Sequence, residues 1–284
     1  MKTYSLEKLV AFTNSPEGGN PAGVWVGESL PEPYQMQKIA REVGFSETAF
    51  LAPANGNVRT VRYFSPEAEV PFCGHATIAA GVALGRQAGG GIYQFNTNVG
   101  RIPVEVSRRN GVMHASLTSV NPKFEPVTSS LLANALSVLG WDKKELDDSI
   151  PPARAFAGAW HLVIAVKSKS RLDDLDYDFD PLKKIMLADN LTTLQLIWRE
   201  NDTLIHSRNP FPVGGVVEDP ATGAAAAALG GYLREAKIIQ TPVDISILQG
   251  EIMGRPSQLK VSIPTAGGVT VSGSAVDINP KNSA

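Results

Sequence analysis

The chain has 284 residues, of which 43% are hydrophobic and 19% are charged, an ordinary composition for a globular protein. Its formal net charge is −2 and its basic residues are scattered, so the sequence predicts neither a nucleic-acid nor a membrane partner. No run approaches the ~18 apolar residues that span a bilayer, and the first residues lack the apolar core of a signal peptide. Cys73 is the single cysteine, which excludes an intrachain disulfide and predicts a cytoplasmic location.

Short strands alternate with helices in the first half of the chain. Apolar residues at the spacing i, i+3, i+4, i+7 predict a helix over 33–43, which ends at Gly44. Apolar and polar residues alternate over 58–64, as in a half-buried strand, and Asn110-Gly111 predicts a hairpin turn. The remaining elements predicted here are strands over 9–12, 24–26, 49–51, 102–106 and 112–117, a helix of small residues that begins near Gly74, and a turn at 89–91.

The second half repeats this style after a stretch that we interpret as the domain linker, 118–128, which carries two prolines and no periodicity. Thr128 is the expected cap of a helix that ends at Gly140, and Asp142 with Glu145 resembles a capping box. Strands are predicted over 162–166, 194–198, 203–206, 243–248, 259–263 and 269–271, and helices from 180 and from 223. Strands and helices are mixed in both halves, which predicts an α+β or α/β protein with two similar domains.

Two glycine-bearing turns each lead into a helix of small residues. The first, over 70–77, reads Val-Pro-Phe-Cys-Gly-His-Ala-Thr, and the second, over 217–224, reads Val-Glu-Asp-Pro-Ala-Thr-Gly-Ala. A helix start offers unpaired N–H groups and the positive end of the helix dipole, which together attract anions. The two turns therefore predict a carboxylate-bearing ligand held between two similar halves.

Titratable residues near these turns are candidates for chemistry, and each also has a structural interpretation. Glu47 follows a helix end, where its position alone favours a solvated loop carboxylate. Asp219 and His75 suit a proton carrier, but equally a helix cap or a core residue. A helix end lowers the pKa of a thiol such as that of Cys73, although most single cysteines are buried and inert. Two acids and a histidine together indicate general acid/base chemistry on a small carboxylic acid.

The sequence predicts no metal and no cofactor. The four histidines show no i, i+4 pair, and Cys73 has no partner thiol. No P-loop, dinucleotide-binding fingerprint or Ser-His-Asp order occurs in the sequence.

Six motifs follow one another along nearly the whole chain. They are Gly-Asn-Pro-Ala-Gly-Val at 19–24, Met-Gln-Lys-Ile-Ala-Arg-Glu at 36–42, Ser-Glu-Thr-Ala-Phe at 46–50, Arg-Tyr-Phe-Ser-Pro at 62–66, the turn at 70–77, and Glu-Asp-Pro-Ala-Thr-Gly at 218–223. Together with the closing Val-Thr-Val-Ser-Gly at 269–273, they resemble the PhzF family of phenazine-biosynthesis isomerases.

The resemblance implies the diaminopimelate-epimerase fold. This is an α+β fold of two pseudo-symmetric domains, each a curved sheet around a central helix, with the active site in the cleft between them. The expected domains are 1–120, completed by a last strand at about 269–284, and 121–268. The resemblance also implies a homodimer.

The family's prototype isomerises trans-2,3-dihydro-3-hydroxyanthranilate by moving a proton without a cofactor. By resemblance, Glu47 carries the proton, while His75 and Asp219 assist and position. The residues expected to bind the substrate are Asn20, Gly74, Ala76, Thr77, Thr222, Gly223 and Ala224. Ala224 stands where the prototype has a serine, so one hydroxyl is missing from the expected site.

Three functions are compatible with these features. The preferred one is a cofactor-independent isomerase that moves a proton on a small aromatic or dihydroaromatic carboxylic acid. The second is an amino-acid racemase or epimerase that uses Cys73, although the usual mechanism needs a thiol in each half. The third is an inactive scaffold that binds a metabolite or a protein.

Overall fold

The structure, a computed structural model, describes residues 4–52 and 55–278. These residues divide into two compact units: unit 1 holds 4–52, 55–118 and 272–278, and unit 2 holds 119–271. No helix in the described ranges is long and apolar enough to cross a membrane.

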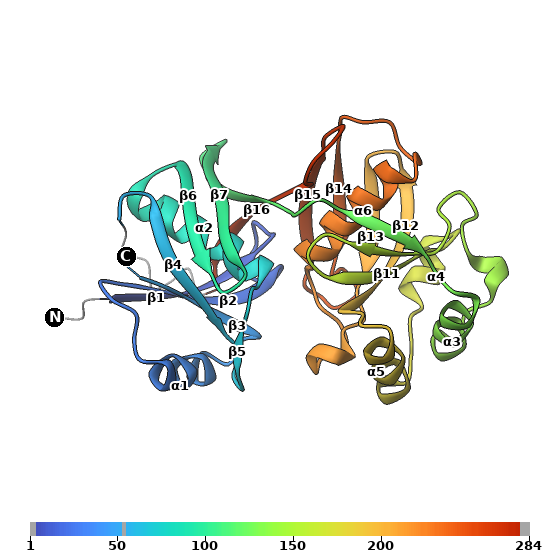
Figure 1. Cartoon of the computed structure of the whole chain (residues 1–284), viewed down its shortest axis with the longest axis horizontal. Helices are drawn as coiled ribbons and strands as arrows, with labels where there is room; N and C mark the ends of the chain where they lie inside the picture. The colour runs from blue at the N-terminus through green and yellow to red at the C-terminus, as the bar shows by residue number, and fades with distance from the viewer. Residues whose placement is uncertain (1–3, 53–54, 279–284) are drawn as a thin grey trace. The chain divides into compact units, whose positions relative to one another are not determined.

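Unit 1 is a ring of strands around one helix. Its sheet order is β1-β2-β3-β4-β6-β7-β8-β16, and β16 also pairs with β1, which closes the ring. The helix α2 contacts β1, β2, β3, β7 and β8 and thus lies inside the ring (Figure 1). The elements are β1 (Tyr4–Ala11), β2 (Asn20–Gly27), α1 (Pro33–Val43), β3 (Glu47–Leu51), β4 (Val58–Phe64), β5 (Glu69–Val70), α2 (Gly74–Ala88), β6 (Gly91–Thr97), β7 (Gly100–Arg109), β8 (Val112–Thr118) and β16 (Thr270–Asp277).

Helix α2 fits inside the ring because many of its side chains are small, alanine and glycine above all. Every residue from His75 to Gly85 is buried. A Cβ added at Gly81 would lie 2.7 Å from Ala115 Cβ and 3.0 Å from Val104 Cγ1, so only glycine allows this approach to β7 and β8. The outer face of the sheet is covered by α1, which packs against Trp25, Phe50 and Phe64 of β2, β3 and β4.

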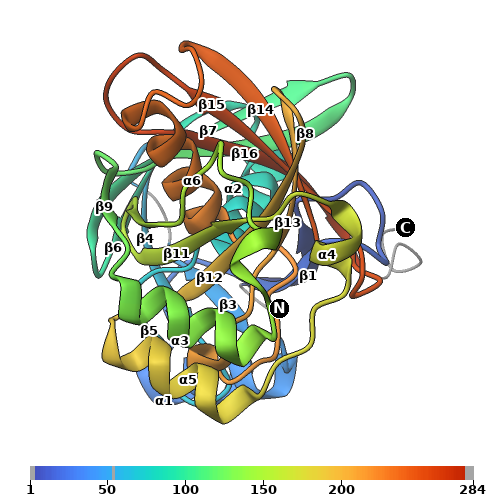
Figure 2. The same ribbon diagram turned by 90° about the vertical axis from the view of Figure 1, so that its right-hand side faces the viewer.

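Unit 2 has a sheet of order β15-β14-β13-β12-β11-β10-β9 with helices on both faces. Helix α6 packs against β9–β12 and β15, while α3 and α5, which lie side by side in Figure 2, share an apolar cluster with Leu162, Ile164, Leu194 and Leu196. The elements are β9 (Lys123–Pro126), α3 (Ser129–Leu139), η1 (Lys143–Glu145), β10 (Ala153–Phe156), β11 (Trp160–Ala165), α4 (Lys169–Asp173), α5 (Phe179–Ala188), β12 (Thr193–Asn201), β13 (Leu204–Arg208), η2 (Pro212–Gly214), α6 (Gly223–Glu235), β14 (Val243–Gln249) and β15 (Ser257–Ile263).

A buried polar network crosses the sheet of unit 2. Asn209 donates to Thr193 Oγ1 at 3.2 Å and to Gln195 Oε1 at 3.0 Å, and Ser207 donates to Asn209 Oδ1 at 2.7 Å. A hydrogen bond of 2.8 Å joins His161 Nδ1 to Thr193 Oγ1. The other ring nitrogen of His161 is buried and makes no hydrogen bond with the described residues. Burial lowers the pKa of His161 to about 3, so the ring stays neutral.

Several local predictions are confirmed. The helix over 33–43 has the predicted bounds, and so does the strand over 58–64. Thr128 caps α3 by accepting a hydrogen bond from the N–H of Leu131, and Asp142 with Glu145 forms a capping box. Each unit combines a sheet with helices, as an α+β fold requires.

One local prediction is wrong, and the sequence pattern missed a strand. The expected linker over 118–128 contains the strand β9, which pairs with β10. Pro126 is compatible with this strand because β9 lies at the edge of the sheet, where a missing N–H leaves no ladder bond unmade. The glycine turn at 89–91 leads directly into β6, a strand that the sequence pattern did not reveal.

We expect Gly81→Leu to destabilise the protein by about 1–3 kcal/mol or more, because the added side chain overpacks the space against β7 and β8. Ala88→Leu, at the exposed end of the same helix, is the matched control and should change stability by less than about 0.5 kcal/mol. Denaturant unfolding of both variants measures the difference. Equal effects at the two positions would contradict the enclosed helix.

We expect the unfolding free energy to decrease as the pH is lowered, because of His161. The unfolded chain takes up a proton at this ring near its ordinary pKa of about 6.5, whereas the native ring does so only near 3. Between these values the unfolded state binds more protons, so the unfolding free energy drops by about 1.4 kcal/mol for each pH unit lost.

His161→Gln should remove this contribution to the slope of unfolding free energy against pH between about pH 4 and pH 6. Thr193→Val is the control, because it removes the hydrogen-bond partner but keeps the titrating ring. Urea unfolding at several pH values gives the slopes. An unchanged slope in His161→Gln would show that the ring is not held neutral.

Candidate active site

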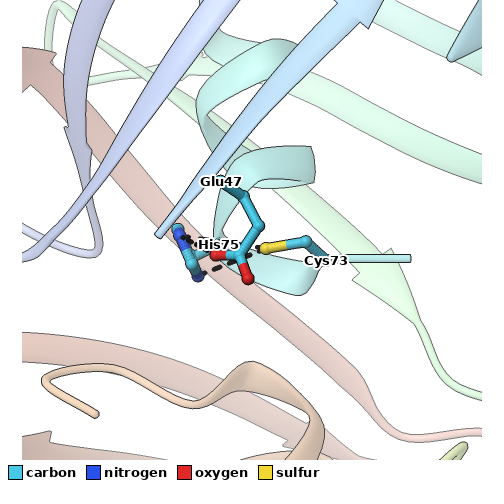
Figure 3. A group of neighbouring side chains, drawn as sticks. All are labelled: Glu47, Cys73 and His75. Atoms are coloured by element: carbon cyan, nitrogen blue, oxygen red, sulfur yellow. Dashed lines mark hydrogen bonds and ion pairs between the residues drawn. The ribbon is translucent and has the colours of Figure 1, made fainter. Parts of the chain in front are cut away.

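Three side chains converge where β3 and α2 begin, as Figure 3 shows. Glu47 is the first residue of β3, Cys73 is the residue just before α2 begins, and His75 is the second residue of that helix. His75 Nε2 lies 3.3 Å from Glu47 Oε2, and the Sγ of Cys73 lies 3.4 Å from His75 Nδ1. Glu47 thus faces a histidine, and its side chain is 19% exposed, which contradicts a freely solvated loop carboxylate.

His75 is the centre of this group. Its Nδ1 lies 3.2 Å from Asn20 Nδ2, and its Nε2 lies 3.4 Å from Ser46 Oγ. An Asn20 amide that donates to Nδ1 leaves the ring proton on Nε2, which faces the Glu47 carboxylate. The arrangement pairs an acid/base carboxylate with an imidazole that can donate a proton to it or receive one from it.

Hydrogen bonds from Thr77 hold the turn that carries Cys73 and His75. The hydroxyl and the N–H of Thr77 both donate to the Cys73 carbonyl, at 2.7 and 3.0 Å. Tyr63 Oη lies 2.6 Å from Thr77 Oγ1, and burial raises the pKa of Tyr63 well above its usual range, so the phenol stays neutral. Thr77 therefore fixes the turn, and its direct contact with substrate stays a prediction.

The start of α2 leaves room for a ligand. No side chain among the described residues caps the helix, and the first N–H groups, from Gly74 to Ala76, have no carbonyl partner within the helix. A Cβ added at Gly74 would meet no described atom within 4 Å. A carboxylate bound there would accept hydrogen bonds from the backbone beside Glu47 and His75.

The second turn, in unit 2, is equally well fixed. Thr222 donates its hydroxyl hydrogen to Asp219 Oδ2 at 2.6 Å. Gln249 donates to the Asp219 carbonyl at 2.7 Å and accepts from the N–H of Thr222 at 3.2 Å. The N–H of Asp219 donates to the Asn209 carbonyl at 3.0 Å, which ties this turn to the buried polar network. Gln249 thus holds both ends of the turn just before α6 begins.

Glu218 has a structural role. It is buried and forms a two-pronged ion pair with Arg208, with N–O distances of 3.0 and 2.7 Å. Arg208 also donates to the carbonyl of Asp173 at 2.8 Å. These contacts anchor the segment before Asp219. Both carboxylate oxygens of Glu218 bind Arg208, so we do not assign Glu218 to ligand binding.

The structure brings the predicted site residues into two groups. At one end of unit 1 lie Asn20, Glu47, Gly74, His75, Ala76 and Thr77, and at the start of α6 in unit 2 lie Asp219, Thr222, Gly223 and Ala224. The sequence interpretation missed Gln249 and Asn209. No local signal marks Gln249, because its partner Thr222 lies 27 residues away in the chain.

The comparisons with known proteins agree with the motifs. The profile of a family described as phenazine biosynthesis-like protein matches residues 9–279. The uncharacterized isomerase YfhB of Bacillus subtilis (strain 168) is 31% identical over 97% of each chain. The trans-2,3-dihydro-3-hydroxyanthranilate isomerase of Pseudomonas fluorescens is 34% identical over 87% of this chain and 86% of its own.

A solved structure shows the same fold. The Bacillus anthracis phenazine biosynthesis protein of the PhzF family superposes with a TM-score of 0.85 over 98% of both chains, at 24% identity. The matched profile and the named relatives together establish that the chain belongs to the phenazine biosynthesis-like (PhzF) family and is an isomerase.

Proposed function

We propose that the protein moves a proton on a small aromatic or dihydroaromatic carboxylic acid, with Glu47 as the proton carrier. The observation that carries the proposal is the contact of 3.3 Å between Glu47 and His75 beside the uncapped start of α2. A relative of 34% identity is named trans-2,3-dihydro-3-hydroxyanthranilate isomerase, which supports this substrate class.

The proposed reaction needs only proton transfers. The Glu47 carboxylate removes a proton from a carbon of the substrate, the electron pair moves along the conjugated system, and the protonated Glu47 returns the proton to another carbon. His75 stabilises the carboxylate through Nε2, and Asn20 orients the ring from Nδ1. Backbone N–H groups at Gly74, His75 and Ala76 would bind the substrate carboxylate, since a helix start favours negative charge.

We assign to Asp219 an assisting role in the same reaction. Its carboxylate is fixed by the Thr222 hydroxyl and its backbone by Gln249, so its position is set before any ligand binds. The start of α6, at Gly223 and Ala224, offers further backbone donors. Because Ala224 has no hydroxyl, backbone N–H groups would bind the substrate at this helix start.

The racemase alternative has one observation in its favour. Cys73 Sγ lies 3.4 Å from His75 Nδ1, the contact that would activate a thiol as a base. The usual mechanism places a second thiol opposite the first, and the sequence has one cysteine. We therefore prefer the carboxylate. The homodimer and the cytoplasmic location expected from the sequence stay predictions.

We expect Glu47→Gln to lower turnover by more than about 10²-fold, because the amide keeps the shape of the side chain but cannot carry a proton. Deuterium uptake from D2O into trans-2,3-dihydro-3-hydroxyanthranilate and related dihydroaromatic carboxylates, followed by mass spectrometry, measures turnover. Glu42→Gln, an exposed acid on α1, is the control and should keep full activity. Wild-type turnover in Glu47→Gln would refute the assignment.

We expect Cys73→Ser to retain most of this turnover, because the thiol takes no part in the proposed proton transfer. The same deuterium assay, with circular dichroism to confirm folding, measures the effect. A folded Cys73→Ser protein without activity, together with an active Glu47→Gln protein, would favour the racemase mechanism instead.

A further inference from the structure

The groups that form the candidate active site also have the composition of a metal site. One ligand atom from each of Glu47, Cys73 and His75 can be chosen so that all three lie within 4.8 Å of one another. We propose that this triad binds a zinc-like divalent cation, which blocks the proton carrier. The sequence predicted no metal because these residues have no recognised ligand spacing; the fold alone brings them together.

Two of the three distances between the donor atoms are close to those of a tetrahedral site. Typical zinc bonds to sulfur, nitrogen and oxygen place tetrahedral neighbours about 3.4 Å apart for nitrogen and oxygen, and about 3.6 Å apart for sulfur and nitrogen. In the protein, His75 Nε2 lies 3.3 Å from Glu47 Oε2 and 3.8 Å from Cys73 Sγ. These two separations are close to the tetrahedral values, and a Glu47 carboxylate oxygen lies within 4.8 Å of Cys73 Sγ, so a cation would draw the thiol and the carboxylate together.

The chemistry of the donors selects the class of cation. A thiolate with an imidazole favours zinc and similar borderline-soft metals, whereas Mg²⁺ and Ca²⁺ prefer sites made of oxygen atoms. Three protein ligands leave the fourth position of a tetrahedron for water or a ligand carboxylate. On binding, Cys73 releases its thiol proton to the buffer, and no oxidation or reduction takes place.

A side chain that would orient the metal-bound imidazole is already in place. Asn20 lies 3.2 Å from Nδ1 of His75, the ring nitrogen that would remain free when Nε2 binds metal. With its amide turned over, Asn20 would accept a hydrogen bond from Nδ1–H through Oδ1, as the polar groups that orient metal-bound histidines do. His75 and Cys73 are 7% and 8% exposed, so the ligands are held by packing before the metal arrives.

A second histidine–carboxylate cluster provides a control. His206 contacts Glu251 through Nδ1 at 2.6 Å and Glu200 through Nε2 at 2.8 Å. The two carboxylates bond to different nitrogens on opposite edges of one ring, so these contacts do not surround a single cation. Like the triad, this cluster combines a histidine with carboxylate groups, but it has no thiol.

The expected inhibition rests on the proposed function, because bound metal occupies both Glu47 and Nε2 of His75. Metal binding itself does not depend on any activity. The two claims therefore need separate measurements.

The binding test uses the full chain after chelation and dialysis. Zn²⁺ is titrated calorimetrically, and Co²⁺ is added to look for the near-ultraviolet charge-transfer band of a cobalt–thiolate bond. We expect one ion per chain and a thiolate band. Asn20→Ala should weaken Zn²⁺ binding by roughly 10–100-fold, and Cys73→Ser should abolish the band and weaken binding further.

His206→Asn, checked for folding, should bind one ion with the wild-type affinity and band. Absence of the band in the wild-type protein, or equal Zn²⁺ binding by Cys73→Ser and wild type, would overturn the site. Deuterium exchange with and without Zn²⁺ then tests inhibition: an active metal-free enzyme that one equivalent of Zn²⁺ stops supports it. Continued turnover by the zinc-bound enzyme would overturn the inhibition, while an inactive metal-free enzyme would count against the proposed function alone.

Discussion

The enclosure of α2 by a closed ring of strands is the constraint on which unit 1 depends. A helix surrounded in this way needs small side chains where the strands approach it most closely, which explains the glycines at 81 and 85. Because the helix cannot shift inside the ring, its first turn is fixed in space. The residues of that turn, Cys73 and His75, therefore meet Glu47 at the start of β3 in a set geometry.

Both units stabilise a helix start with buried polar groups. In unit 1, Thr77 and the neutral phenol of Tyr63 hold the turn. In unit 2, Gln249 and Asn209 hold the turn that carries Asp219. A buried polar network costs free energy wherever an atom lacks a partner, as at Nε2 of His161. Fixed turns also reduce the rearrangement that accompanies ligand binding.

The side chains of Glu47, Cys73 and His75 support two chemistries, because the same atoms can transfer protons or bind a metal ion. Proton transfer needs the Glu47 carboxylate and the imidazole to be free of other strong partners. A thiol within 3.4 Å of the same imidazole adds the third donor that a borderline-soft cation requires. Asn20 serves both states, because an amide can donate to the ring or accept from it.

Local features could be predicted from the amino-acid sequence alone. Periodicity and capping residues predicted α1, the caps of α3 and η1, and the small-residue helices, because these depend on neighbours in the chain. The motifs pointed to Glu47, His75 and Asp219. Tertiary structure decided what those residues contact: it paired Glu218 with Arg208, placed β9 at a sheet edge, and set Gln249 beneath the Asp219 turn. The tertiary structure also brought Glu47 together with Cys73 and His75. Contacts between a strand and a helix depend on how the ring of strands closes, so no characteristic residue spacing in the sequence reveals them.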